Sequence, residues 1–134
     1  MALWDVARGE EIDNGEIDSI DGHVPVYAIA WSPNGKWIAT AGTDNQIIIQ
    51  DSKTREVVRR LSGHTSYVSA LDWSPDSQRL SSASADRAVC VWNIDESIEY
   101  TSIASQQADA NVLSISWAPD SNRLAWGDSS GSAH

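Results

Sequence analysis

The sequence has few cysteines and few basic residues, and each shortage excludes a class of protein. A single cysteine, Cys90, among 134 residues excludes an internal disulfide framework and an all-cysteine zinc site. Its neighbours Val89, Val91 and Trp92 include no cation that would lower its pKa, which favours a buried thiol over a reactive one. The N-terminus has neither a basic segment nor an apolar core, so we expect an intracellular, cytoplasmic location.

Basic side chains are outnumbered, with 9 Lys and Arg against 19 Asp and Glu and a formal net charge of −10. Nonspecific affinity for nucleic acid comes mainly from basic side chains, so this balance argues against it and against docking on an anionic membrane. The longest apolar run, residues 24–31, covers 8 residues and contains a proline. A membrane-spanning helix needs about 20.

The overall composition and the length of the chain are typical of one folded domain. The chain is 41% apolar and 21% charged, which is globular composition, and 134 residues is an ordinary length for a single unit.

A tryptophan followed by Ser or Ala, Pro, and Asn or Asp begins at residues 31, 73 and 117, so the motif recurs after 42 and 44 residues. A short apolar run precedes each motif, and turn residues separate further β-branched or aromatic runs. The predicted strands are residues 26–31, 37–41, 47–49 and 56–61; 68–73, 79–83, 89–92 and 98–103; and 112–117 and 123–127.

No segment keeps a helical spacing of apolar residues over ten positions, so the pattern predicts an all-β protein with four antiparallel strands in each period. One four-stranded unit cannot bury both of its faces alone, so such units must stack.

The second period carries a specific set of motifs. They are Gly63-His64, Trp73-Ser74-Pro75-Asp76, Ser82-Ala83-Ser84-Ala85-Asp86 and Val91-Trp92-Asn93. This set resembles a blade of a WD-repeat (WD40) β-propeller. The first period is similar, with Gly22-His23, but Gln50 replaces its terminal aromatic residue. In the third period Gln107 and Ala108 stand in place of the Gly-His pair.

The resemblance implies a single partial β-propeller over residues 1–134. Residues 1–21 would supply the third and fourth strands of one blade, 22–62 and 63–105 two complete blades, and 106–134 the first and second strands of another. Propellers close with about four to eight blades, so about three leave a ring open. Unpaired strands and open blade faces at both ends would then invite association.

The same resemblance implies a buried hydrogen-bonded tetrad in each blade. Its members would be His64, Ser82, Asp86 and Trp92 in the second repeat, and His23, Thr40 and Asp44 in the first, where Gln50 stands at the Trp position. Ser, His and Asp also make up a nucleophilic triad, and a hydrolase is the enzymatic alternative. Nothing in the sequence resembles an oxyanion-hole or nucleophile-elbow motif, so we favour the structural tetrad and expect no enzyme.

Seven tryptophans could form an aromatic cage for a glycan or methyl-lysine, but three of them recur at one strand position and are expected in the core. Trp126 departs from the repeat, because it occupies the place of the tetrad Ser or Thr; it is either exposed or fills an incomplete blade. The acid-rich residues 5–21 lack the spacing of a cation-binding loop and are read as a solvated face. Three arginines, Arg55, Arg59 and Arg60, are expected on an outer edge strand.

In WD-repeat proteins, partner peptides dock near the start of the first strand and the turn after the second. The matching residues are Pro25, Tyr27 and Thr43; Tyr67, Ser69 and Ala85; and Asn111, Leu113 and Ser129. Tyr27 and Tyr67 are the strongest candidates, because aromatic residues with a polar tip are typical binding anchors.

The expected function is a non-catalytic scaffold for protein partners, without a cofactor or metal. We expect it to complete its propeller by oligomerisation, with a dimer of about six blades favoured over a trimer. The alternatives are a fragment of a longer WD-repeat signalling or regulatory protein, and a propeller that binds a small ligand or glycan.

Overall fold

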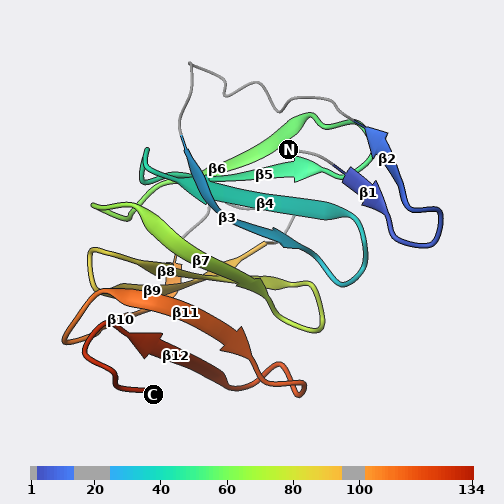
Figure 1. Ribbon diagram of the computed structural model, residues 1–134. Coiled ribbons are helices and arrows are strands. Elements are labelled where there is room, and N and C mark those ends of the chain that lie inside the picture. The colour runs from blue at the N-terminus through green and yellow to red at the C-terminus, as the bar shows by residue number, and fades with distance from the viewer. Residues whose placement is uncertain (1–2, 14–24, 95–101) are drawn as a thin grey trace.

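The computed structural model describes residues 3–13, 25–94 and 102–134, and over these ranges the chain forms strands and turns without a helix (Figure 1). The strands are β1 (Leu3–Asp5), β2 (Glu10–Asp13), β3 (Val26–Trp31), β4 (Trp37–Gly42), β5 (Ile47–Asp51), β6 (Val57–Leu61), β7 (Val68–Trp73), β8 (Arg79–Ser84), β9 (Ala88–Asn93), β10 (Ser102–Gln107), β11 (Val112–Trp117) and β12 (Leu124–Asp128).

The strands form antiparallel sheets in the order of the repeats. Blade 1 has the order β3-β4-β5-β6 and blade 2 the order β7-β8-β9-β10, while β11 and β12 form a two-stranded sheet that we call blade 3. A second two-stranded sheet pairs β1 with β2. Figure 1 shows β3, β7 and β11 following one another across the stack, and β7 contacts both of the others. The all-β fold with four antiparallel strands per blade is confirmed, and the described strands do not close a ring.

Three strands begin later in the sequence than predicted. The fourth strand of blade 1 begins at Val57 instead of Glu56, so Arg55, with a left-handed backbone (φ 64°), lies before the edge strand and not on it as expected. The fourth strand of blade 2 is Ser102–Gln107 instead of residues 98–103, because its register with β9 sets Gln107 opposite Ala88. Residues 98–101 lie outside the described ranges. The last strand begins at Leu124 and not at Arg123, because the equivalent residues Trp37 and Arg79 pair with a third strand, whereas the described part of blade 3 has two strands.

The turn after each tryptophan motif is built in the same way in the first two blades. The Asn34 carboxamide oxygen accepts hydrogen bonds from the Ser32 hydroxyl and the Lys36 N–H, and the Asp76 carboxylate does the same in blade 2. The next residue is left-handed at Gly35 (φ 73°), and its equivalents in blades 2 and 3 share that conformation. This geometry explains the repeated Pro-Asn/Asp sequence.

On the first two strands of each blade, large and small side chains lie mainly on opposite faces, whereas on β5 the large Ile47 and Ile49 share the face of the small residues. We call the face toward the preceding blade the leading face and the opposite one the trailing face. On β3 and β4 the trailing face carries small residues such as Ala30 and Ala39, and Trp73 and Leu80 from the leading face of blade 2 pack against them. A second cluster between blades 2 and 3 includes Ala83 and Val112. Stacking of large on small faces therefore forms the core.

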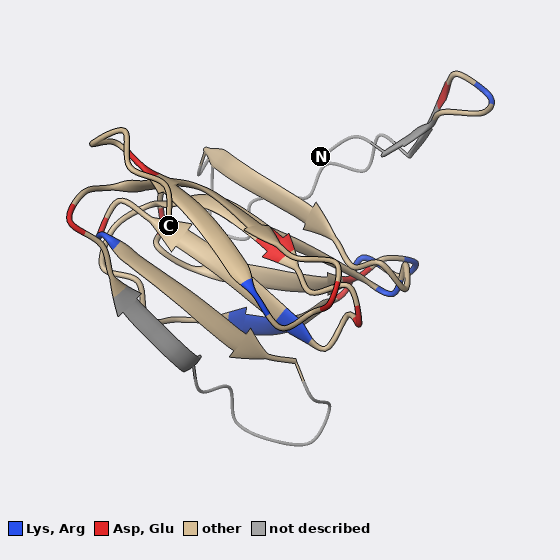
Figure 2. Cartoon of the chain, turned by 90° about the horizontal axis from the view of Figure 1, so that it is seen from below, with Lys and Arg blue, Asp and Glu red and all other residues tan. Residues whose placement is uncertain are grey.

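In blades 1 to 3 most strand positions are uncharged, and charged residues lie at the turns and at a few strand positions (Figure 2). One of these strands is β6, the edge strand of blade 1, which carries Arg59 and the exposed Arg60. The described ranges contain no helix with the length and apolar character that crossing a membrane requires.

Candidate functional site

The first candidate site is a chain of hydrogen bonds inside blade 2. His64 lies before β7, Ser82 on β8, Asp86 in the turn after β8, and Trp92 on β9. His64 Nδ1 lies 2.8 Å from Asp86 Oδ2, and His64 Nε2 lies 2.7 Å from Ser82 Oγ. The Trp92 indole N–H donates to the same hydroxyl oxygen at 2.8 Å. The structure therefore brings all four residues of the predicted network together.

Burial determines what this network can do chemically. The Ser82 side chain is fully enclosed, and the His64 side chain is 1% exposed. The His64 and Trp92 rings meet edge to face with centroids 6.2 Å apart, which covers the imidazole further. The atoms lie as in a Ser-His-Asp triad, but a substrate would have to open the blade to reach the hydroxyl. Because these buried polar groups have hydrogen-bond partners, they avoid the free-energy cost that an unpaired buried polar group would carry.

Asp86 anchors the network at its outer end. Burial alone would raise its pKa, but hydrogen bonds from the Thr65 N–H, from His64 and from the Ala88 N–H outweigh burial, and the pKa lies below its usual value. These contacts tie the segment before β7 to the turn between β8 and β9.

The corresponding place in blade 1 is different. Gln50 stands opposite Ile38 on β4, just as Trp92 stands opposite Leu80 on β8, so the two positions are equivalent. The Gln50 side chain is buried, and its amide oxygen has no hydrogen-bond partner. Thr40 is buried as well, whereas Asp44 is exposed and accepts a hydrogen bond from the Gln46 N–H at 3.2 Å. His23 lies outside the described residues.

The predicted partner face is assembled by one repeated backbone contact. The N–H of the first turn residue after the second strand donates to the carbonyl of the residue before the first strand. The bonds join Thr43 to Pro25 at 3.3 Å, Ala85 to Tyr67 at 3.0 Å, and Ser129 to Asn111 at 2.9 Å.

Two tyrosines cross the boundary between blades 1 and 2 on this face. The rings of Tyr27 and Tyr67 meet edge to face at 5.5 Å, and the residues are 57% and 37% exposed. Leu113 is exposed as well. Ser69 differs from the other predicted residues, because its hydroxyl donates to the carbonyls of Ala83 and Val112 and joins blades 2 and 3.

Sequence reasoning missed a polar cluster in blade 3. The buried Asp128 accepts hydrogen bonds from the Ser130 hydroxyl and backbone N–H, and lies 3.2 Å from His134 Nε2. The Ser130 hydroxyl is the main cause of the lowered pKa of Asp128, and His134 adds to it. The sequence signal for this cluster was weak, because Asp128 stands at the repeat position that is a serine, Ser84, in blade 2.

Trp126 is partly buried and packs inside blade 3. It packs against the second core cluster, and its ring stacks on His134 with centroids 5.4 Å apart. The backbones of Trp126 and His134 exchange two hydrogen bonds, at 3.1 and 2.9 Å, so the last residues pair beside β12. Of the two places left open for this side chain, the structure selects the packed one.

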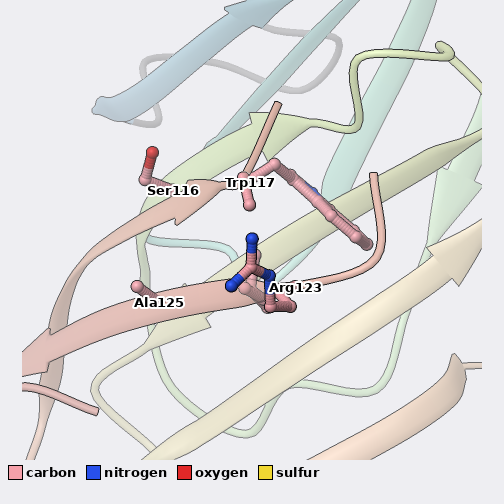
Figure 3. A pocket seen from close by; sticks show the side chains of 6 residues that line it. Ser116, Trp117, Arg123 and Ala125 are labelled. Atoms are coloured by element: carbon pink, nitrogen blue, oxygen red, sulfur yellow. The ribbon is translucent and has the colours of Figure 1, made fainter. Parts of the chain in front are cut away.

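A pocket of about 350 Å³ lies on blade 3 at the end of β11 and the start of β12 (Figure 3). Its lining residues are Ser116, Trp117, Ala118, Arg123, Leu124 and Ala125. No group of three or more His, Cys, Asp or Glu side chains within the described ranges is placed to hold a metal ion.

This arrangement is that of a WD-repeat propeller. The family model for the WD domain, G-beta repeat, matches residues 15–51 and 55–93, and the chain belongs to the WD40 family.

Among similar proteins, WD repeat-containing protein 1 of Gallus gallus is 43% identical over 72 residues, which are 52% of this chain and 12% of that protein. The same protein of Bos taurus is 42% identical over 73 residues, 52% of this chain and 12% of its own. B-type cell cycle switch protein ccs52A of Medicago truncatula is 34% identical over 121 residues, which are 89% of this chain and 24% of that protein. The chain thus spans no more than a quarter of these relatives.

Proposed function

We propose that this chain is a non-catalytic module that binds protein segments on the face that carries Tyr27 and Tyr67. WD40 repeats are in general scaffolds for protein interactions, and this chain belongs to that family. The observation that carries the proposal is the exposed pair of tyrosine rings, 5.5 Å apart, at a junction that backbone hydrogen bonds fix in both blades.

The tyrosine pair suits this role because of its shape and rigidity. A tyrosine has few rotatable bonds, so it loses little conformational entropy on binding and offers a large apolar ring with a polar tip. The two rings already support each other, which lowers the cost of ordering them further. The burial of the Ser82 hydroxyl favours binding over hydrolysis as the function of the chain.

Selection from a displayed peptide library tests the binding face. Peptides selected on the unmodified chain should lose about tenfold or more in affinity on Tyr27→Ala or Tyr67→Ala, because hot-spot aromatics contribute about 2 kcal/mol or more. Val6→Ala is the matched control, since Val6 is 90% exposed in the turn between β1 and β2. Equal affinity for all three variants would contradict the proposal.

We further propose that two copies of the chain complete a ring of about six blades. The leading face of blade 1 and the trailing face of blade 3 both carry side chains exposed to solvent, such as Ile29 and Ala125. In a second candidate arrangement, further blades of a longer chain cover these two faces. The lengths of the relatives support this arrangement, because each relative is at least four times as long as the part that matches this chain. The solution mass of this chain separates the two.

A further inference from the structure

Tryptophans at one repeat position join each blade to the one before it. The Trp73 indole N–H donates to the carbonyl oxygen of Ala30 at 3.1 Å. The Trp117 indole N–H donates to the carbonyl oxygen of Asp72 at 3.2 Å. In both joints the acceptor is the residue immediately before the tryptophan of the preceding blade. The contact is therefore a property of the repeat.

A side chain of the preceding blade also lies at each joint. Trp117 lies on Arg79, with the guanidinium 4.9 Å from the ring centroid. At the equivalent place in blade 1 stands Trp37, which packs against the core cluster that contains Trp73. We call the carbonyl and this side chain together the tryptophan seat. Seats on blades 1 and 2 are occupied by the tryptophans of blades 2 and 3.

At the start of the stack one tryptophan has no seat. Trp31 is 50% exposed, whereas its equivalent Trp73 is 3% exposed. The same contrast holds for Val26, which is 60% exposed, and Val68, which is fully buried. Trp73 and Val68 are buried in the cluster between blades 1 and 2, whereas Trp31 and Val26 are exposed, although Ile38 and Gln50 on the same face as Trp31 are buried.

At the end of the stack one seat has no tryptophan. Ser116, Arg123 and Ala125 line the pocket on blade 3, and they occupy the places of Asp72, Arg79 and Ser81 in blade 2. The Arg79 side chain is 29% exposed beneath Trp117, while the Arg123 side chain is 80% exposed. Figure 3 shows Ser116 and Ala125 on the two strands and Arg123 between them.

We propose that Trp31 of one chain occupies this pocket on a second copy, and that this contact is the joint of the assembly. The inference rests on the proposed association of two copies. In the joint, the Trp31 indole N–H donates to the Ser116 carbonyl and the ring lies against the Arg123 guanidinium, a cation–π contact. The contact is head to tail, and in a pair of chains the Trp31 side chain of each copy enters the pocket of the other.

The repeat also shows what this joint lacks. The Asn34 N–H donates to the Ser77 hydroxyl at 3.0 Å, and the Asp76 N–H donates to the Ser121 hydroxyl at 3.2 Å. At the proposed joint between two chains, Gly35 occupies the repeat position of Ser77 and Ser121. Glycine has no hydroxyl, so the corresponding hydrogen bond between blades is missing there. Gly35 has the same left-handed backbone as Ser77, and a Cβ atom there would meet nothing within 4 Å. Gly35→Ser therefore supplies the missing hydroxyl.

Sedimentation equilibrium of the 134-residue chain and its variants tests the joint. Trp31→Ala and Arg123→Glu should each weaken the dimer by about tenfold or more, because each removes one side of a buried aromatic contact. Gly35→Ser should tighten it by several-fold, since a hydrogen bond contributes about 1 kcal/mol. Lys53→Ala, in the exposed turn between β5 and β6, is the control and should leave the dimer unchanged. Far-UV circular dichroism confirms that each variant keeps its sheets.

Mixing the two weakened variants tests the head-to-tail geometry. A pair of Trp31→Ala with Arg123→Glu contains one intact joint, so the mixture should associate more tightly than either variant alone. A Trp31→Ala chain that dimerises as tightly as the unmodified chain would overturn the joint but leave the proposed dimer standing. An unmodified chain that stays monomeric with native sheet content would overturn both, and the peptide-binding face would still be judged by its own experiment.

Discussion

At the scale of single residues, Trp92 and Gln50 show how one substitution changes a blade. Both side chains are buried at the same place in the register. Trp92 completes a hydrogen-bonded network through the Ser82 hydroxyl, whereas the Gln50 amide oxygen has no partner. A buried acceptor without a partner costs free energy, so blade 1 has lost a contribution to stability that blade 2 keeps.

Replacing these two residues should therefore have unequal effects. Trp92→Ala should lower the free energy of unfolding by about 3–5 kcal/mol, as expected for a buried aromatic. Gln50→Ala should lower it much less, because the side chain already leaves an acceptor unpaired. Urea unfolding followed by circular dichroism measures both. Equal losses would show that Gln50 contributes as much to its blade as Trp92 does.

Ser82→Ala separates the structural reading of the network from the hydrolytic one. Removing the hydroxyl leaves His64 Nε2 and the Trp92 indole N–H without their partner, so we expect a loss of about 1–3 kcal/mol in stability. Turnover of generic ester substrates should be absent both before and after the change. A stable variant that loses a measurable esterase activity would favour the hydrolase.

The low pKa of Asp86 predicts acid sensitivity of blade 2. A carboxyl whose pKa is lower in the folded than in the unfolded chain stabilises the fold above the unfolded value of about 3.9. That contribution is lost as the pH falls through the folded pKa. In urea titrations from pH 7 to pH 3, Asp86→Asn should be less stable than the unmodified chain at pH 7, and the gap should narrow below about pH 4. A gap that does not change with pH would contradict this.

At the scale of elements, most strands could be predicted from alternating apolar residues and from turn residues between them. The reason is that successive side chains of a strand point to opposite faces, so a buried face places an apolar residue at every second position. The strand β10 was predicted too early in the sequence: Ile98 and Ile103 suggested a strand over residues 98–103, whereas the strand that pairs with β9 is Ser102–Gln107. The His64 network could be predicted because its residues recur at fixed spacings. The Asp128 cluster could not, because a tertiary contact with His134 forms it and no other repeat has an equivalent.

The pairing of the last residues with β12 depends on Asp128. Its carboxylate holds the Ser130 and Ser132 N–H groups, and hydrogen bonds to a charged group contribute about 1.5–3 kcal/mol. Asp128→Ala should therefore release this segment, so that the amides of Trp126 and His134 exchange at least about tenfold faster by nuclear magnetic resonance. Unchanged exchange would show that the strand pairing holds on its own.

At the scale of the whole molecule, the three blades form a stack with two unlike ends. One end presents large side chains such as Trp31 and Ile29, and the other presents small ones such as Ser116 and Ala125. Inside the stack the same kinds of face pack against each other in the two core clusters. The two free ends are therefore complementary, which is what a head-to-tail closure of two chains requires.

The mass of the chain in solution, measured by light scattering during size-exclusion chromatography, tests this account most directly. Two chains that close one ring should form a species of about twice the monomer mass of 14.6 kDa, and this species should dissociate on dilution. A folded monomer of 14.6 kDa at every concentration would contradict it.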